Sequence, residues 1–347
     1  MKKTIFAIIF AVCALSFGSV EVYSTEEISA KSAIVYEPMS KTVLYEKSAD
    51  EQMLIASTTK IMTALVVLEK CTLDERVEVK SEHTAVEGSS MYLRTDGEYT
   101  VEDLLYGLML ASGNDAAAAL AEHTAGSMES FAALMNEKCR SLDLKNTHFV
   151  NAHGLDAEDH YSSAGDLALI TAAAMENEVF CRIFSTASYT VDGKTFHNHN
   201  KLLSSCDGCI GGKTGYTKKA GRVLVSCVER YGMRLICVTV SAPDDWRDHM
   251  KLYDDCFREY KYVSLINEED KIPLISGEKE YAKLNSSLGG AVVSKNLDTE
   301  VIYHLPRFVF APVSAGEKAG YAEIRGENGY FKKIDIFYGE SVSRIKK

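Results

Sequence analysis

The spacing of hydrophobic and polar residues changes along the chain and separates a mixed helical and strand region from a region of short strands. Residues 32–50, "SAIVYEPMSKTVLYEKSAD", predict a hairpin of two short strands around Pro38–Lys41. Residues 58–70 carry apolar side chains on nearly every side and predict a buried helix. From residue 210 to 241 the apolar period is two, which predicts a strand, a Tyr-Gly turn and a second strand.

Helical patterns fill most of the chain between the hairpin and that strand pair. In residues 100–126, Thr100 is followed three residues later by Asp103, a spacing typical of a capped helix start. Two Ala- and Leu-rich helices are expected there, interrupted at Ser112-Gly113-Asn114. Two further helices are expected within residues 127–144 and 163–178.

After residue 262 the helical patterns stop. Short alternating stretches such as "EVIYHLP" and "GYAEIRGENGYFKKIDIFYG" predict strands joined by Gly-rich turns. We therefore expect an α/β domain over residues 28–260 and a small all-β domain over residues 263–345.

The first 24 residues are typical of an export signal. Lys2 and Lys3 precede the almost wholly apolar run Thr4–Phe17, and small residues follow it. That run is short for a membrane span, so we expect export to the cell wall or periplasmic space, with the signal either cleaved or kept as an anchor.

Composition narrows the possible partners. A formal net charge of −11 and a pI near 5.4 argue against nucleic acid, whose phosphates require a basic surface. The nine cysteines are irregularly spaced, and the one close pair, Cys206 and Cys209, fits loop cysteines, with or without a disulfide, better than a metal site. "HNHN" at residues 197–200 lacks a companion acid and is expected to be a polar loop, so no metal or cofactor is predicted.

Ser57 and Lys60 form the first candidate chemical pair. Positions three apart share one face of a helix, so the lysine amine can reach the serine hydroxyl. A lysine that is desolvated or lies beside another cation can lose its proton and activate a serine. The spacing alone is weak, since it arises by chance about once in a chain of this length, and a role for Ser57 as a helix cap stays open.

Two later motifs strengthen that pair. Ser112 and Asn114 offer a second hydroxyl and an amide at the break between two helices. Lys213-Thr214-Gly215 opens a strand with a cation, a hydroxyl and a residue without a side chain. The order Ser-x-x-Lys, Ser-x-Asn, Lys-Thr-Gly is a known pattern of β-lactam-recognising acyl-transfer enzymes.

With these motifs in place, the chain resembles the low-molecular-mass penicillin-binding proteins that are serine-type D-alanyl-D-alanine carboxypeptidases. The resemblance rests on "ASTTKIMTALVVLE", "GSSMYLRTDGEYTVEDLLYGLMLASGNDAAAALAEH", "NAHGLDAEDHYSSAGDLALI" and "GGKTGYTKKAGRVLVSCV", and spans most of residues 30–260. It implies a β-lactamase/transpeptidase-like domain, an antiparallel sheet with flanking helices and a helical subdomain, followed by the all-β domain.

The resemblance also assigns roles to residues. Ser57 would be the acylated nucleophile, Lys60 its base, and Ser112 and Asn114 the facing wall of the cleft. Lys213 and Thr214 would bind the terminal carboxylate of the substrate, with Arg247 near the same end, and Gly215 would lie against the substrate backbone. The backbone N–H groups of Tyr216 and Ser57 would bind the carbonyl oxygen. His153 would help the water that hydrolyses the acyl-enzyme.

The implied reaction removes the last D-alanine from peptidoglycan stem peptides, and β-lactams would acylate the same serine. One rival is a class A-like β-lactamase, for which Glu158 is the available glutamate. Another is a non-catalytic sensor of wall peptides or β-lactams. The C-terminal "FKKIDIFYGESVSRIKK" shows no clear apolar stripe for a membrane-bound helix, so membrane association stays open.

Overall fold

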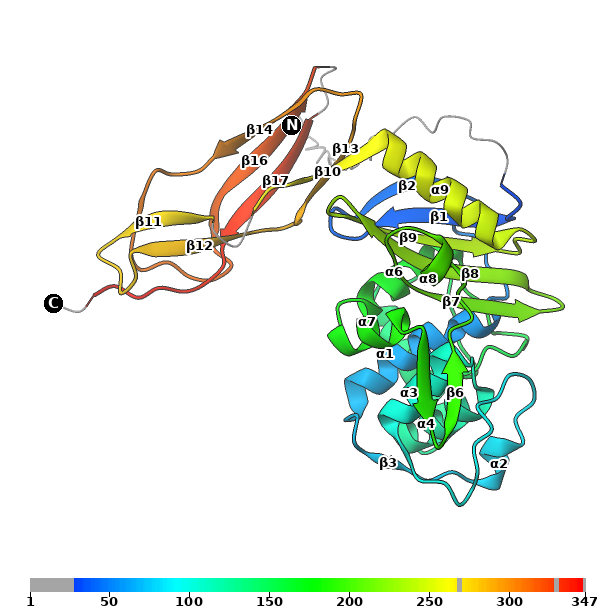
Figure 1. Cartoon of the computed structure of the whole chain (residues 1–347). Helices are drawn as coiled ribbons and strands as arrows, with labels where there is room; N and C mark the ends of the chain where they lie inside the picture. Colours follow the sequence, from blue (N-terminus) through cyan, green and yellow to red (C-terminus); the bar gives the residue numbers. More distant parts are fainter. Residues whose placement is uncertain (1–27, 267–269, 328–330, 346–347) are drawn as a thin grey trace, which may run out of the picture.

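The first domain is built on one antiparallel sheet. The computed structural model describes residues 28–266, 270–327 and 331–345, and the expected export signal lies outside them. The sheet order is β2-β1-β9-β8-β7 (Figure 1). Its strands are β1 (Ser32–Glu37), β2 (Thr42–Lys47), β7 (Cys209–Thr217), β8 (Gly221–Arg230) and β9 (Met233–Val240).

Both predicted strand pairs are confirmed. Strands β1 and β2 pair antiparallel around the turn that contains Pro38. Strands β8 and β9 pair through a turn at Tyr231 and Gly232, whose φ values are 54° and 73°. Two successive left-handed residues match the right-handed twist of a hairpin, so this turn sets the register of the two strands.

Alternation along the strands gives the sheet two apolar faces. Ile34 and Tyr36 point into a large core shared with the helices of one face, whereas Ala33 and Val35 point into a second core that includes Tyr253. The larger core is formed with six helices: α1 (Lys60–Lys70), α3 (Val101–Leu110), α4 (Asn114–Ala125), α5 (Met128–Ser141), α6 (Ala164–Ala174) and α7 (Glu178–Ser185). The opposite face is covered by α9 (Asp245–Glu259).

The predicted helix start at Thr100 and the predicted break at residues 112–114 are both confirmed. The Thr100 hydroxyl accepts from the Asp103 N–H, and the Asp103 carboxylate accepts from the Thr100 N–H in return. Helix α3 ends at Leu110 and α4 begins at Asn114. Ser112 lies between them at φ 57°, a left-handed conformation that a serine adopts only under constraint.

Smaller elements complete this domain. They are the 3₁₀ turn η1 (Ala56–Thr59), α2 (Ser81–Thr84), α8 (Leu202–Ser205), and the two-stranded pairs β3 (Arg76–Val77) with β4 (Tyr99–Thr100) and β5 (Ser188–Val191) with β6 (Lys194–His197).

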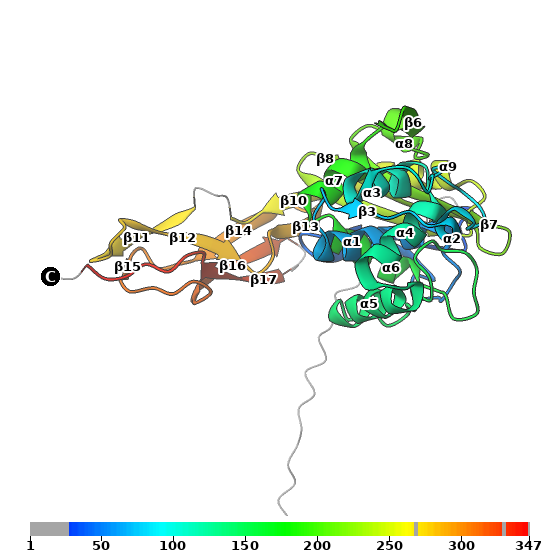
Figure 2. The ribbon, with the colours of Figure 1, turned by 90° about the horizontal axis from the view of Figure 1, so that it is seen from below.

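The C-terminal region forms a separate elongated body of strands, as Figures 1 and 2 show. A six-stranded sheet has the order β14-β16-β17-β12-β11-β15. Its strands are β11 (Lys271–Ile275), β12 (Tyr281–Ser286), β14 (Thr299–His304), β15 (Val309–Phe310), β16 (Lys318–Gly326) and β17 (Phe331–Tyr338). The fold class expected from the sequence, an α/β domain followed by an all-β domain, is confirmed.

The two bodies meet at a short strand pair. Strand β10 (Tyr260–Ser264) continues directly from α9 and pairs with β13 (Gly290–Ser294). Val292 of β13 joins the core beneath α9, so this junction is packed. None of the helices among the described residues is long and apolar enough to cross a membrane.

Candidate active site

Ser57 lies on a tight turn at the start of a buried helix. The 3₁₀ turn η1 holds it, and α1 follows from Lys60. Ala56 precedes it at φ 47°, a strained conformation of the kind that clusters at functional sites. No side-chain cap closes η1 or α1, so the alternative of Ser57 as a helix cap is wrong. The turn leaves Ser57 half-buried.

Lys60 is fully buried, and its amine has three acceptors. Its Nζ lies 3.0 Å from Ser57 Oγ, 2.7 Å from Asn114 Oδ1 and 2.6 Å from the His153 carbonyl oxygen. The Asn114 amide is itself fixed, because its Nδ2 donates to the Glu87 carbonyl at 2.6 Å. The structure therefore brings together the serine and lysine of the first motif and the asparagine of the second.

The second and third motifs meet through Lys213. This lysine of β7 is also buried, and its Nζ donates to Ser112 Oγ at 2.9 Å and to the Thr214 carbonyl at 2.9 Å. Ser112 is thus held between the two helices and the strand. Each of the two buried lysines is thus hydrogen-bonded to a serine, Lys60 to Ser57 and Lys213 to Ser112.

Strand β7 passes very close to the Ser57 turn. A Cβ added at Gly215 would lie 3.0 Å from the Ile55 carbonyl oxygen and 3.0 Å from the Ser57 nitrogen. Any side chain at this position would force the turn or the strand to shift by a few tenths of an ångström. The next residue, Tyr216, is two-thirds exposed, and Thr214 is half-buried. The strand edge beside Ser57 therefore presents backbone groups to a ligand.

Burial controls the charge of both lysines. Desolvation, and next the positive charge of Lys213, lower the pKa of Lys60 well below its usual value, opposed by the negative charge of Asp115. Desolvation lowers the pKa of Lys213 to about 7. Burial therefore shifts both lysines toward their neutral forms.

His153 contributes its backbone carbonyl to Lys60, which the sequence did not suggest. Its imidazole Nδ1 accepts from the Leu155 N–H at 3.2 Å. Desolvation, with the nearby charge of Lys60, lowers the pKa of His153 to about 4, so the ring is neutral near pH 7. Gly154 follows at φ 85°, and a Cβ there would overlap the Ala56 carbonyl oxygen at 2.0 Å. The loop is thus pressed against the Ser57 turn.

Among the described residues, no hydrogen bond or ion pair joins Arg247 to this group. Arg247 is exposed on α9, and α9 packs on the face of the sheet opposite α1. Glu158 is exposed as well, and no hydrogen bond or ion pair joins it to Ser57 or Lys60 within the described ranges.

Two residues that hold segments beside the site by hydrogen bonds were not predicted from the sequence. Asp115 accepts from the Met91 and Leu93 N–H groups at 3.0 and 3.1 Å and so holds the loop before α3. His160 accepts from the Val150 N–H at 3.2 Å through Nδ1, so its Nε2 carries the proton toward Thr59 Oγ1 at 2.8 Å. The Asp115 position beside Asn114 could have been noticed, but nothing in the sequence connects His160 to Thr59.

The cysteine pair and the histidine loop show no metal-binding group. Cys206 and Cys209 are both free thiols, so a disulfide between them is not formed. The Cys206 sulfur accepts from the Arg230 guanidinium at 3.3 Å, and the Cys209 sulfur from the Asn200 amide at 3.7 Å. In the part of the chain that the structure describes, neither pair belongs to a cluster able to hold a metal ion.

The fold and the sequence both have known relatives. The D-alanyl-D-alanine carboxypeptidase DacF of Bacillus subtilis is 32% identical over 84% of this chain and 80% of its own length. DacC of Escherichia coli, with the same enzyme name, is 33% identical over 90% of this chain and 84% of its own.

Solved structures agree with these relatives. Penicillin binding protein 5 from Haemophilus influenzae matches with a TM-score of 0.76 and 27% identity, over 92% of this chain and 99% of that one. A D-alanyl-D-alanine carboxypeptidase from Mycobacterium tuberculosis matches with a TM-score of 0.64 and 33% identity, over 69% of this chain and 93% of that one. The sequence profile of one family covers residues 19–244, and the chain belongs to that family, the D-alanyl-D-alanine carboxypeptidases.

Proposed function

We propose that this protein is a serine-type carboxypeptidase that removes the terminal D-alanine from peptidoglycan stem pentapeptides through an acyl-enzyme on Ser57. The observation that carries the proposal is the set of three contacts around the Lys60 amine. Family membership supports the substrate class, and the contacts around Lys60 support the mechanism.

The three contacts favour a neutral Lys60 as the base. A neutral amine has two N–H groups and one lone pair. Asn114 Oδ1 and the His153 carbonyl can only accept hydrogen bonds, so they take the two N–H groups. The lone pair is left facing Ser57 Oγ at 3.0 Å, within reach of its proton. Burial removes water from the amine and keeps this arrangement neutral.

The substrate would lie along β7. Its terminal carboxylate would meet Lys213 and the Thr214 hydroxyl, and its backbone would fit against Gly215. The scissile carbonyl oxygen would accept from the N–H groups of Ser57 and Tyr216, which stabilise negative charge as it develops. We assign the proton for the departing amine to Ser112, whose Oγ accepts a hydrogen bond from Lys213 Nζ at 2.9 Å.

The reaction proceeds in two steps. Ser57 Oγ attacks the carbonyl carbon between the two D-alanines and its proton passes to Lys60. The C–N bond then breaks with release of D-alanine, as Ser112 gives its proton to the departing amine and regains one from Lys60. Water then attacks the ester carbon, its proton passes through Lys60 to Ser57 Oγ, and the ester C–O bond breaks to free the serine. We assign the orientation of that water to the neutral His153 ring. Penicillins would acylate Ser57 in the same way, with slow release.

The substrate also fixes where the enzyme must work. Peptidoglycan stem peptides lie outside the cytoplasmic membrane, so the proposed function requires export, which the basic and apolar start of the chain supports.

Release of D-alanine from a pentapeptide that ends in D-Ala-D-Ala tests the proposal. The wild-type chain should release one D-alanine per peptide, and Ser57→Ala should release none while keeping the wild-type melting temperature. A penicillin hydrolysed rapidly without D-alanine release would instead support the β-lactamase. Peptide binding without release by the wild type would support the sensor.

A further inference from the structure

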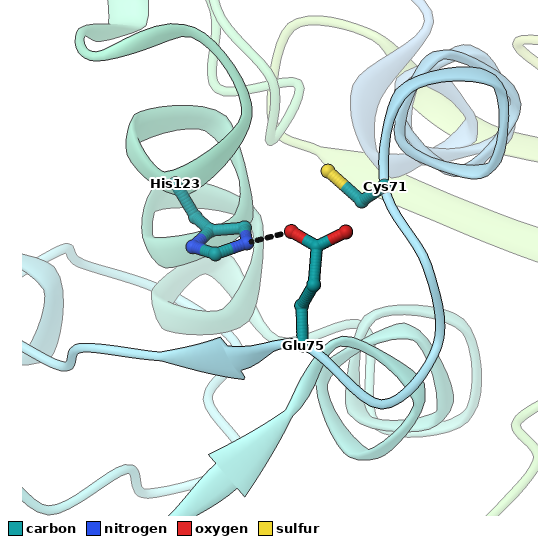
Figure 3. Close-up of side chains that lie close together, drawn as sticks. All are labelled: Cys71, Glu75 and His123. Carbon is teal, nitrogen blue, oxygen red and sulfur yellow. Dashed lines mark hydrogen bonds and ion pairs between the residues drawn. The ribbon is translucent and has the colours of Figure 1, made fainter.

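A second cluster of reactive side chains lies away from the active site, on the helical side of the first domain. Figure 3 shows Cys71, Glu75 and His123 pointing toward one another from three segments. Cys71 directly follows α1, Glu75 lies in the turn before β3, and His123 lies in the last turn of α4. Their ligand atoms all lie within 4.8 Å of one another, and all three residues are half-buried.

These three groups form a ligand set suited to zinc. Thiolate, imidazole and carboxylate are the donors that zinc uses in proteins. With metal–ligand distances of about 2.0–2.3 Å, a tetrahedral site places its ligand atoms about 3.3–3.8 Å apart. The present separations reach that range with side-chain movements of roughly 1 Å. Partial exposure gives an ion an entry path and leaves the fourth position to water.

Neighbouring groups already orient two of the three ligands. The Thr72 N–H donates to Glu75 Oε1 at 2.5 Å, which leaves Oε2 directed at His123 Nε2, 3.0 Å away. The Cys71 sulfur lies 3.5 Å from the Thr124 hydroxyl. Such partners hold ligands in place in metal sites. The cluster has no role in the proposed reaction, because its residues lie at or just beyond the ends of α1 and α4 that are remote from Ser57.

We propose that Cys71, Glu75 and His123 bind one zinc ion that joins the C-terminal ends of α1 and α4. Both helices begin in the active site, with Lys60 first on α1 and Asn114 first on α4, and the two side chains are hydrogen-bonded. The zinc ion would lie about 15 Å farther along, since a helix rises 1.5 Å per residue. The helix pair that positions the catalytic lysine would then be fixed at both ends, and the metal acts in stability alone.

Zinc retention by the purified chain tests this site. After incubation with zinc and dialysis against metal-free buffer, the wild type should keep one equivalent per chain and melt at a higher temperature than the metal-free protein. Removing a group that only hydrogen-bonds to a metal ligand weakens metal binding by about 10- to 100-fold. Removing a ligand itself should cost more, so Cys71→Ser and His123→Gln should each raise the zinc dissociation constant by at least about 100-fold. Cys181→Ser, which removes another half-buried thiol, should bind as the wild type does.

A cobalt spectrum of the wild type supplies evidence that needs no variant. Cobalt(II) in this site should show a near-ultraviolet thiolate-to-cobalt charge-transfer band, and Cys71→Ser should lack it. Equal retention of zinc by wild type and Cys71→Ser would overturn the proposal, and so would the absence of both retention and the thiolate band in the wild type. Because these readouts do not depend on D-alanine release, they stand apart from the test of the proposed function.

Discussion

Lys60 is the residue on which the proposed chemistry depends. As an ammonium group it would donate to all three of its neighbours and could not accept the Ser57 proton. As a neutral amine it can. Burial and the charge of Lys213 both lower the pKa of Lys60, so two separate features of the structure favour the reactive form.

Replacing Lys60 by arginine separates the role of a base from the role of a positive charge. Arginine stays protonated in proteins, so Lys60→Arg keeps a cation but cannot accept a proton. We expect kcat/KM for D-alanine release to fall by about 10²–10⁴-fold, the usual contribution of a general base. Lys70→Arg, at the exposed end of the same helix, should have no effect. Activity of Lys60→Arg within about threefold of wild type would exclude the base role.

The two lysines together predict a bell-shaped pH dependence of kcat/KM. Activity should rise with pH as Lys60 loses its proton, and fall above about pH 7 as Lys213 loses the charge that attracts the substrate carboxylate. In the complex that carboxylate raises the pKa of Lys213, so the falling limb of kcat should lie at higher pH than that of kcat/KM.

A variant identifies the group behind the falling limb. Lys213→Arg keeps the charge at every accessible pH and should abolish the fall, whatever its effect on the maximum rate. A falling limb that stays at the same pH in Lys213→Arg would assign it to another group.

At the scale of elements, the site depends on how closely the loop after His153 and strand β7 press against the turn η1. Gly154 makes this contact at φ 85°, and its absent Cβ leaves room for the Ala56 carbonyl. A larger residue there must push the turn away, and Ser57 moves with the turn.

Gly126 provides a matched control for this contact. It has φ 81°, but a Cβ there would meet nothing within 4 Å. Both Gly→Ala changes lose about 1–2 kcal/mol of unfolding free energy through the left-handed backbone. Gly154→Ala should lose at least about 2 kcal/mol more and most of its activity, whereas Gly126→Ala should stay fully active. Chemical denaturation and D-alanine release measure the two effects, and equal losses in both variants would show that the contact is unimportant.

Elements with strong local signals could be predicted from the sequence, and those fixed by distant contacts could not. The hairpin at Pro38, the cap at Thr100 and the break at Ser112 all have local causes, and each was found. The 3₁₀ form of the Ser57 turn depends on β7 and on the Gly154 loop, which are more than 90 residues away in sequence. A single sequence does not report such contacts, so a regular helix start was predicted there.

At the scale of the whole molecule, the buried His160 and His249 and the half-buried His153 make the fold sensitive to acid. Burial, as the largest cause in each case, lowers the pKa of His153 to about 4, of His160 to about 3 and of His249 to about 3. His249 ties α9 to the sheet, with Nδ1 2.7 Å from Ser226 Oγ and Nε2 3.0 Å from Thr239 Oγ1. All three rings are neutral in the folded state near pH 7.

The free energy of unfolding should therefore fall as pH drops below about 6.5, the usual histidine pKa of an unfolded chain. Between that value and the folded pKa values the unfolded state binds more protons, so acid favours unfolding. Each histidine contributes a slope of up to about 1.4 kcal/mol per pH unit. Denaturation from pH 7 to pH 4 should show a smaller slope for His249→Gln, and an unchanged slope for the exposed control His197→Gln. Identical slopes for wild type and His249→Gln would contradict this account.

The arrangement of the molecule was only partly predictable. The change from helices to strands near residue 262 is visible in the sequence, because the apolar period changes there. The cluster of Cys71, Glu75 and His123 could not be predicted. His123 lies on α4, far in sequence from the short Cys71–Glu75 segment, and only the packing of the helices brings them together. In the sequence, the closest cysteine pair is Cys206 and Cys209, but their sulfurs contact Arg230 and Asn200.

The central claim is that Ser57 forms the covalent intermediate, and the intact mass of the protein after brief exposure to benzylpenicillin tests it most directly. The wild type should gain the mass of one penicillin, and peptide mapping should place it on the segment that contains Ser57. Ser57→Ala should gain nothing. A wild-type adduct at another residue, or an adduct that persists in Ser57→Ala, would contradict the assignment of Ser57 as the nucleophile.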